Sequence, residues 1–131
     1  VATTDNINKN YHFSIDDRLN IIHNSLFKDL KLSKKKIEVI SFDNLTIDLC
    51  KKYKASTIIR GLRAVSDFEY EFQLAGMNKK LNNNIETVFL MSDIENQIIS
   101  SKFVKEIAKL NGNINNFLTK TAAKTLQKKL K

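Results

Sequence analysis

The 131-residue sequence lacks tryptophan and proline and contains one cysteine, and these absences narrow the kinds of protein it can be. The single cysteine, Cys50, cannot form an internal disulfide, which suits a reducing compartment such as the cytosol. No apolar run approaches the roughly eighteen residues that a membrane-spanning helix requires. We attribute the lack of proline, alongside abundant Lys, Asn and Ile, to a GC-poor genome rather than to the chemistry of the protein.

The length and the charge of the chain give a first outline of what is present. With 42% apolar residues, the chain is long enough for a single domain, residues 1–131, with a substantial core. The formal net charge of +8 favours anionic partners, either nucleic acid or phosphorylated small molecules. Lysines concentrate at residues 34–36, 51–54 and 120–131, and the simpler explanation of that excess is a solvated basic surface.

Short apolar runs and helical patterns alternate along the chain. The predicted strands are residues 1–4, 37–42, 57–60 and 87–91. The predicted helices are one that begins at Ser14, residues 44–54, residues 66–81, one from Ser100 to Asn111, and residues 119–130. This alternation predicts an α/β fold with a parallel sheet and helices on both of its faces. Ligands of such sheets bind beyond the carboxyl ends of the strands.

Two arginines flank a short bend where the third predicted strand ends, in the sequence "STIIRGLRAVSDFEYEFQ". We predict a turn at residues 60–63, in which Gly61 lets a ligand approach the backbone and Arg60 and Arg63 bind phosphate. The run from Ser66 to Glu69 predicts a capping box, and its helix terminus would add further donors. The alternative is that the arginines only pair with neighbouring carboxylates, namely Asp67, Glu69 and Glu71.

The helix predicted at residues 66–81 carries two apolar stripes. One consists of Phe68, Phe72 and Ala75, and the other of Tyr70, Leu74, Met77 and Leu81. We expect one stripe to pack on the sheet and the other on a second subunit. The alternative is a helix enclosed by its own chain.

Ser100 and Ser101 stand at the predicted amino end of a helix. Unpaired backbone N–H groups and two hydroxyls at that position can bind a phosphate, although serine is also a common N-cap residue. The prediction therefore depends on this helix end sharing the sheet edge with Arg60 and Arg63.

Further segments complete a pattern that covers nearly the whole chain. They are "IIRGLRAVSDFEYEFQLAGMNKKL", "VFLM", "IISSKFVKEIA", "GNINNFL" and, upstream, "FSIDDRLNII". Together they resemble the bacterial phosphopantetheine adenylyltransferases. The resemblance implies a Rossmann-like nucleotidyltransferase fold, assembled as a homohexamer in the cytoplasm. It also implies transfer of AMP from ATP to 4′-phosphopantetheine, giving dephospho-coenzyme A and pyrophosphate with Mg²⁺, and neither a membrane nor nucleic acid as partner.

The same resemblance assigns roles to individual residues. Lys9, Arg60 and Arg63 would neutralise charge during an in-line transfer that forms no covalent enzyme intermediate. The positions expected to bind phosphopantetheine are Lys9, Thr46 (through its backbone) and Arg60. The positions expected to bind ATP are Gly61, Leu62, Arg63, Glu71, Asn96, Gln97, Ile98, Ile99, Ser100, Ser101 and Lys102. No residue is assigned as a metal ligand.

The sequence departs from the family pattern at several points, including family prolines that are replaced at Tyr11 and Ser92. The family's catalytic histidine follows a first strand, and we expect it in a strand-loop-helix unit of about thirty residues before Val1. We predict that a chain beginning at Val1 shows no turnover, and that His12 and His23 are ordinary surface residues. Lys102 replaces a small hydroxyl residue of the family and could alter the affinity for ATP.

Three other functions fit parts of the sequence. A related nucleotidyltransferase could act on nicotinate mononucleotide or a cytidylyl substrate. A basic nucleic-acid-binding module would explain the net charge, although no basic stripe interleaved with aromatic residues is present. A non-catalytic homologue could act only by assembling with other copies.

Overall fold

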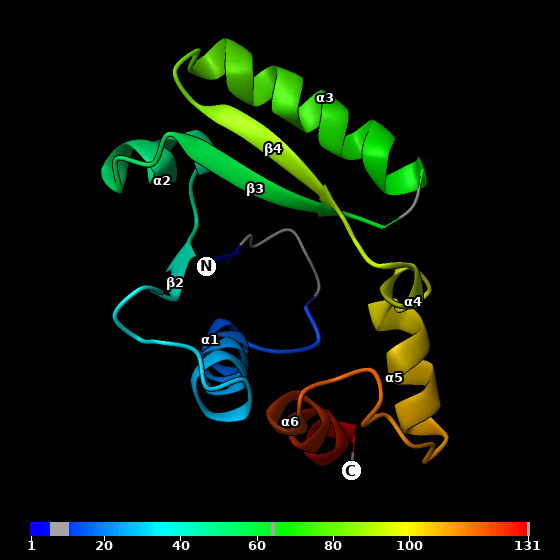
Figure 1. Cartoon of the computed structure of the whole chain (residues 1–131). Helices are drawn as coiled ribbons and strands as arrows, with labels where there is room; N and C mark the ends of the chain where they lie inside the picture. The colour runs from blue at the N-terminus through cyan, green and yellow to red at the C-terminus, as the bar shows by residue number, and fades with distance from the viewer. Residues whose placement is uncertain (6–10, 64, 131) are drawn as a thin grey trace. The chain divides into compact units, whose positions relative to one another are not determined.

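The structure of the protein is a computed structural model that describes residues 1–5, 11–63 and 65–130. Its elements follow in the order β1 (Ala2–Thr4), α1 (Ile15–Asn24), the π-helix η1 (Ser25–Asp29), β2 (Ile40–Phe42), α2 (Thr46–Lys52), β3 (Thr57–Leu62), α3 (Val65–Leu81), β4 (Glu86–Met91), α4 (Ile94–Gln97), α5 (Ser101–Lys109) and α6 (Lys120–Leu130) (Figure 1). Strands and helices alternate, which confirms the predicted α/β class. In this part of the chain, no helix combines the length and the apolar character needed to cross a membrane.

The chain divides into two compact units. One comprises Val1–Asp43 with Ser100–Lys131, and the other comprises Asn44–Ile99. In the first unit, β1 and β2 pair in parallel, with Ala2 opposite Ile40. The side chain of Ser14 accepts the Asp17 N–H, which confirms the predicted N-cap of α1. The best-buried side chains of this unit come from α5, α6 and the loop between them, namely Val104, Ala108, Ile114, Ala123 and Leu126.

In the second unit, β3 and β4 pair in parallel from Thr57 opposite Glu86 to Leu62 opposite Met91. The helix α3 runs along this pair of strands (Figure 1). A small core forms where α2 meets the sheet and consists of Ile47, Cys50 and Ile85, with Ala55 and Ile58 packed against it. Backbone pairing and this core hold β3 in place, and β3 carries the arginines singled out from the sequence.

The helix α3 turns a polar strip toward the strands, between the two predicted apolar stripes. Two residues of this strip, Glu71 and Asn78, lie two helical turns apart and are among its best-buried side chains. Phe68 contacts Phe89 of β4, with ring centroids 6.4 Å apart. Leu74 is half-buried, whereas the other large apolar side chains of the two stripes remain exposed, namely Phe68, Tyr70, Phe72, Met77 and Leu81. The prediction that a whole apolar stripe packs on the sheet is therefore wrong.

Several boundaries differ from the sequence prediction. The strand β3 continues to Leu62, because its pairing with β4 keeps residues 60–62 extended where a turn was predicted. The strand β2 begins only at Ile40, which is the residue opposite the start of β1. The helix α3 begins at Val65, so Ser66 lies in its first turn and is not an N-cap. The described strands form two two-stranded sheets instead of the one predicted, and neither the π-helical geometry of η1 nor the short helix α4 was predicted.

Candidate active site

Arg60, near the carboxyl end of β3, forms a two-point ion pair with Glu71 of α3. Its Nε donates to Glu71 Oε2 at 2.7 Å, and its Nη2 donates to Oε1 of the same carboxylate. The Glu71 side chain is only 12% exposed, whereas that of Arg60 is 43% exposed. Because Glu71 accepts these hydrogen bonds, the pKa of Arg60 is raised above its ordinary value, and partial burial opposes that rise. The pair therefore joins a strand to a helix and leaves part of the guanidinium accessible.

Arg63 lies directly after β3 and contacts two further segments. Its Nε donates to Asp67 Oδ2 at 3.1 Å, on the first turn of α3. Its Nη1 donates to the carbonyl oxygen of Ile99 at 2.9 Å, at the end of the segment that follows β4. The structure thus brings together Arg63 and Ile99, two positions predicted to bind ATP, although they are far apart in the sequence.

Both arginines pair with carboxylates, as the alternative interpretation of this segment predicted. Such pairing leaves room for a phosphate, because a guanidinium carries five N–H donors. Among the described residues, Arg60 uses its Nε and Nη2 atoms and Arg63 uses its Nε and Nη1 atoms. Each guanidinium therefore keeps further N–H groups that could donate hydrogen bonds to a phosphate oxygen.

Gly61 and Leu62 contribute backbone rather than side chains to this region. Gly61 lies inside β3 opposite Leu90 and has no positive φ, so the predicted bend at this glycine is wrong. A Cβ atom added at Gly61 would meet no atom within 4 Å. The glycine is therefore not required by the packing of the protein itself, and the space beside it is open. The Leu62 side chain is buried and unavailable to a ligand.

The predicted ATP-binding segment after β4 forms a short helix, a connection and the start of α5. Gln97 ends α4 and donates from Nε2 to the Ser92 carbonyl oxygen at 3.3 Å. The hydroxyl of Ser100 accepts the Phe103 N–H at 3.2 Å, which confirms Ser100 as the N-cap of α5. The remaining positions are largely exposed, namely Asn96, Ile98, Ser101 and Lys102. This part of the prediction thus falls at an accessible helix amino terminus, as expected.

The structure describes some of the other predicted residues. Thr46 is the first residue of α2. Lys9 lies outside the described residues. His23 is exposed as predicted, but His12 is half-buried against Phe13, so its assignment as a surface residue is wrong.

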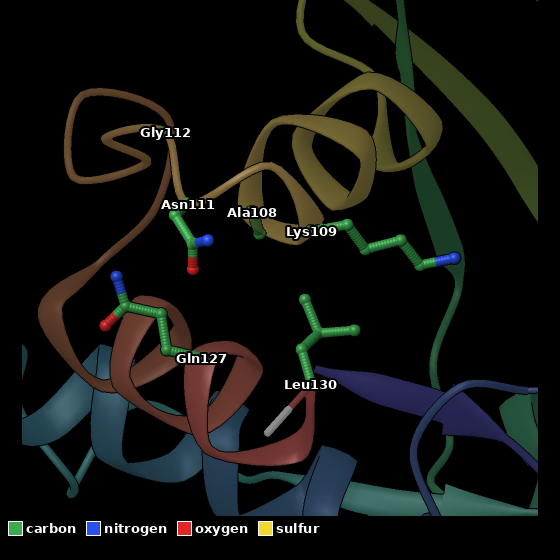
Figure 2. A pocket seen from close by; sticks show the side chains of 6 residues that line it. All are labelled: Ala108, Lys109, Asn111, Gly112, Gln127 and Leu130. Carbon is green, nitrogen blue, oxygen red and sulfur yellow. The ribbon is translucent and has the colours of Figure 1, made fainter.

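The described side chains form no evident metal cage, and they line two pockets. Within this part of the chain, no group of three or more His, Cys, Asp or Glu side chains is placed to hold a metal ion. A pocket of about 300 Å³ lies between the end of α5 and α6 and is lined by Asn111, Gln127 and Leu130 among others (Figure 2). Another, of about 450 Å³, lies between α1 and α6. None of the predicted site residues that the structure describes is among the residues lining these two pockets.

Arg18 is an anchoring residue that the sequence analysis missed. From α1 its Nη1 donates to the Thr4 carbonyl oxygen at 2.7 Å and to Thr3 Oγ1 at 3.2 Å, and its Nη2 donates to Asp5 at 3.3 Å. Its guanidinium carbon lies 3.9 Å from the centre of the Tyr11 ring. Arg18 thereby holds the carboxyl end of β1. The sequence offered one signal for this anchoring role: polar residues end the first predicted strand, and an arginine follows one turn into the next helix.

Comparison with known proteins places this chain in a family. The cytidylyltransferase-like family model matches residues 2–107. A phosphopantetheine adenylyltransferase of Pelagibacter ubique is 67% identical over 98% of this chain and 79% of its own length. Proteins of the same name from Zymomonas mobilis and Staphylococcus haemolyticus are 45% and 44% identical, over 97% and 100% of this chain and 71% and 78% of their own lengths. The chain therefore belongs to the phosphopantetheine adenylyltransferase family of cytidylyltransferase-like proteins.

Proposed function

We propose that the protein transfers the adenylyl group of ATP to 4′-phosphopantetheine, giving dephospho-coenzyme A and pyrophosphate in coenzyme A biosynthesis. The main support is the high identity to proteins named for this activity, across almost the whole chain. The position of Arg60 and Arg63 at the carboxyl end of a parallel strand agrees with it, because ligands of α/β sheets bind there.

The chemistry asks the protein mainly to hold two anionic substrates in line. A phosphate oxygen of phosphopantetheine attacks the α-phosphorus of ATP, and the bond from that phosphorus to the bridging oxygen of pyrophosphate breaks. We assign the phosphate of phosphopantetheine to Arg60 and the phosphates of ATP to Arg63, with Lys9 contacting both substrates. Fixed positive charge at these positions lowers the repulsion between the reactants and stabilises the charge of the transition state.

Mg²⁺ belongs to this proposal as an ion carried by the nucleotide. Two carboxylates near the arginines, Asp67 and Glu71, are already paired with Arg63 and Arg60. This set of side chains suits an ion held chiefly by phosphate oxygens and water, which is a usual arrangement for Mg²⁺. When bound, the ion would neutralise part of the triphosphate charge.

We further propose that the protein acts as a homo-oligomer in the cytoplasm, with a hexamer as the size suggested by the resemblance. The exposed apolar residues of α3 support association, because Tyr70, Phe72 and Met77 are each about 60% exposed on one helix. The reduced, buried thiol of Cys50 is consistent with a reducing compartment.

The test is a substrate panel, run on the full-length protein, that offers ATP or CTP together with phosphopantetheine or nicotinate mononucleotide, with pyrophosphate release as the signal. We expect turnover only with ATP and phosphopantetheine. Arg63→Ala should raise the KM for ATP by about tenfold or more, because it removes a charged donor from the nucleotide side. Turnover with another pair of substrates, or none with this pair, would refute the proposal.

A further inference from the structure

The ion pair between Arg60 and Glu71 fixes one edge of the guanidinium. The two donating atoms, Nε and Nη2, belong to the same side of the planar group, and both reach the same carboxylate. This two-point contact defines the plane of the guanidinium as well as its position. The opposite edge, formed by Nη1 and the second N–H of Nη2, has no acceptor among the described residues. That edge is itself a fork of the kind that binds phosphate.

The carboxylate that makes this contact is held firmly. Glu71 lies one turn after Phe68, and Phe68 contacts Phe89, the residue that pairs with Arg60 across the sheet. The strand pair and the helix thus touch at two neighbouring points, one aromatic and one ionic. At the other end of α3, an ion pair joins Lys79 to Glu86 of β4. Glu71 is therefore carried on a helix that is tied to the strands along its length.

We propose that Glu71 is a positioning residue for the acceptor substrate, which it serves by orienting the guanidinium of Arg60 toward the phosphate of phosphopantetheine. The inference rests on the proposed function and adds to it. The family resemblance places Glu71 only among the positions that bind ATP, whereas the hydrogen bonds connect it to the arginine of the other substrate. A change at Glu71 should therefore act on the acceptor through Arg60.

The central experiment compares Glu71→Gln with wild type in the full protein, measuring KM and kcat for each substrate and phosphopantetheine binding by calorimetry. An amide offers one acceptor oxygen in place of two and no negative charge, so the guanidinium loses its fixed plane. We expect phosphopantetheine to bind about tenfold more weakly, with the KM for ATP changed by less than about threefold, as for the loss of one charge-assisted contact. Glu71→Asp keeps the charge but is shorter, and should also weaken acceptor binding.

Glu86→Gln is the matched control, because it removes another ion pair between α3 and a strand at the far end of the helix. We expect its kinetics to equal those of wild type. A second comparison uses Arg60→Met, which removes the guanidinium and keeps a similar stem. If Glu71 acts through Arg60, adding Glu71→Gln to Arg60→Met should cause no further loss of acceptor binding.

The outcomes separate the inference from the function on which it rests. If wild type turns over both substrates and Glu71→Gln changes only the KM for ATP, the positioning role is wrong and the function stands. The same conclusion follows if Glu71→Asp behaves as wild type, since charge alone would then suffice. If wild type neither binds phosphopantetheine nor releases pyrophosphate, the proposed function fails and the inference fails with it.

Discussion

Replacing Arg18 tests how much of the first unit depends on a single side chain. The Arg18 side chain is 15% exposed, and its guanidinium donates to the carbonyl of Thr4 and the hydroxyl of Thr3 while covering the ring of Tyr11. Its contact with Asp5 lies at the surface, where that carboxylate is half exposed, and ion pairs of this kind contribute little. The stabilisation should therefore come from the two partly buried hydrogen bonds and the aromatic contact.

The magnitude follows from these contacts. A hydrogen bond from a charged donor contributes about 1.5–3 kcal/mol, and a partly buried cation–π contact contributes about 0.5–2 kcal/mol. Allowing for overlap between them, we expect Arg18→Ala to lower the free energy of unfolding by about 2–4 kcal/mol. Arg18→Lys keeps the charge but lacks the planar fork, so it should recover less than about half of that loss.

The assay is urea unfolding followed by far-ultraviolet circular dichroism, because the chain has no tryptophan to report by fluorescence. Lys51→Ala serves as the control, since among the described residues Lys51 pairs only with Asp48, at 3.6 Å on the surface. Its loss should change stability by less than about 0.5 kcal/mol. If Arg18→Ala costs no more than Lys51→Ala, Arg18 does not anchor β1 and the reasoning fails.

Three further changes probe packing, protonation and reactivity. Gly112→Ala would place a Cβ atom 2.6 Å from Ile107 Cγ2 and should lower the free energy of unfolding by about 1–3 kcal/mol. Gly76→Ala meets open space in α3 and should raise that free energy by up to about 1 kcal/mol. Equal effects of the two substitutions in urea unfolding would contradict this. A backbone N–H in the first turn of α6 lowers the pKa of Asp29, so its ionised form stabilises the fold at neutral pH and this contribution is lost as the pH falls through the lowered pKa. Asp29→Asn should then be less stable than wild type at pH 7 and equally stable in strong acid. If the two free energies of unfolding differ by the same amount across that pH range, the ionised Asp29 carboxylate is not the source of the stabilisation. Burial raises the pKa of the Cys50 thiol, so iodoacetamide should modify it at least about tenfold faster in urea than in the folded protein, as judged by mass spectrometry.

Local sequence signals predicted the elements of this fold better than their ends. The N-caps Ser14 and Ser100 were found because a hydroxyl residue before a helical pattern acts on the nearest N–H groups. The extent of β3 was missed because an Arg-Gly pair looks like the start of a turn. Pairing with β4 instead keeps Gly61 and Leu62 extended, and that pairing depends on residues distant in the sequence.

The partners of the two arginines are selected by the helix that follows them. Three carboxylates were candidates on proximity alone, but Asp67 and Glu71 lie one turn apart on the face of α3 that meets β3, whereas Glu69 is exposed. Hydrophobic periodicity could not reveal this face, because a periodic pattern of apolar residues marks only apolar buried faces, and this buried face of α3 is polar. A buried carboxylate nevertheless requires a partner, since leaving its charge uncompensated would be costly. An arginine on the facing strand satisfies that requirement, and the two-point contact in turn fixes the plane of its guanidinium.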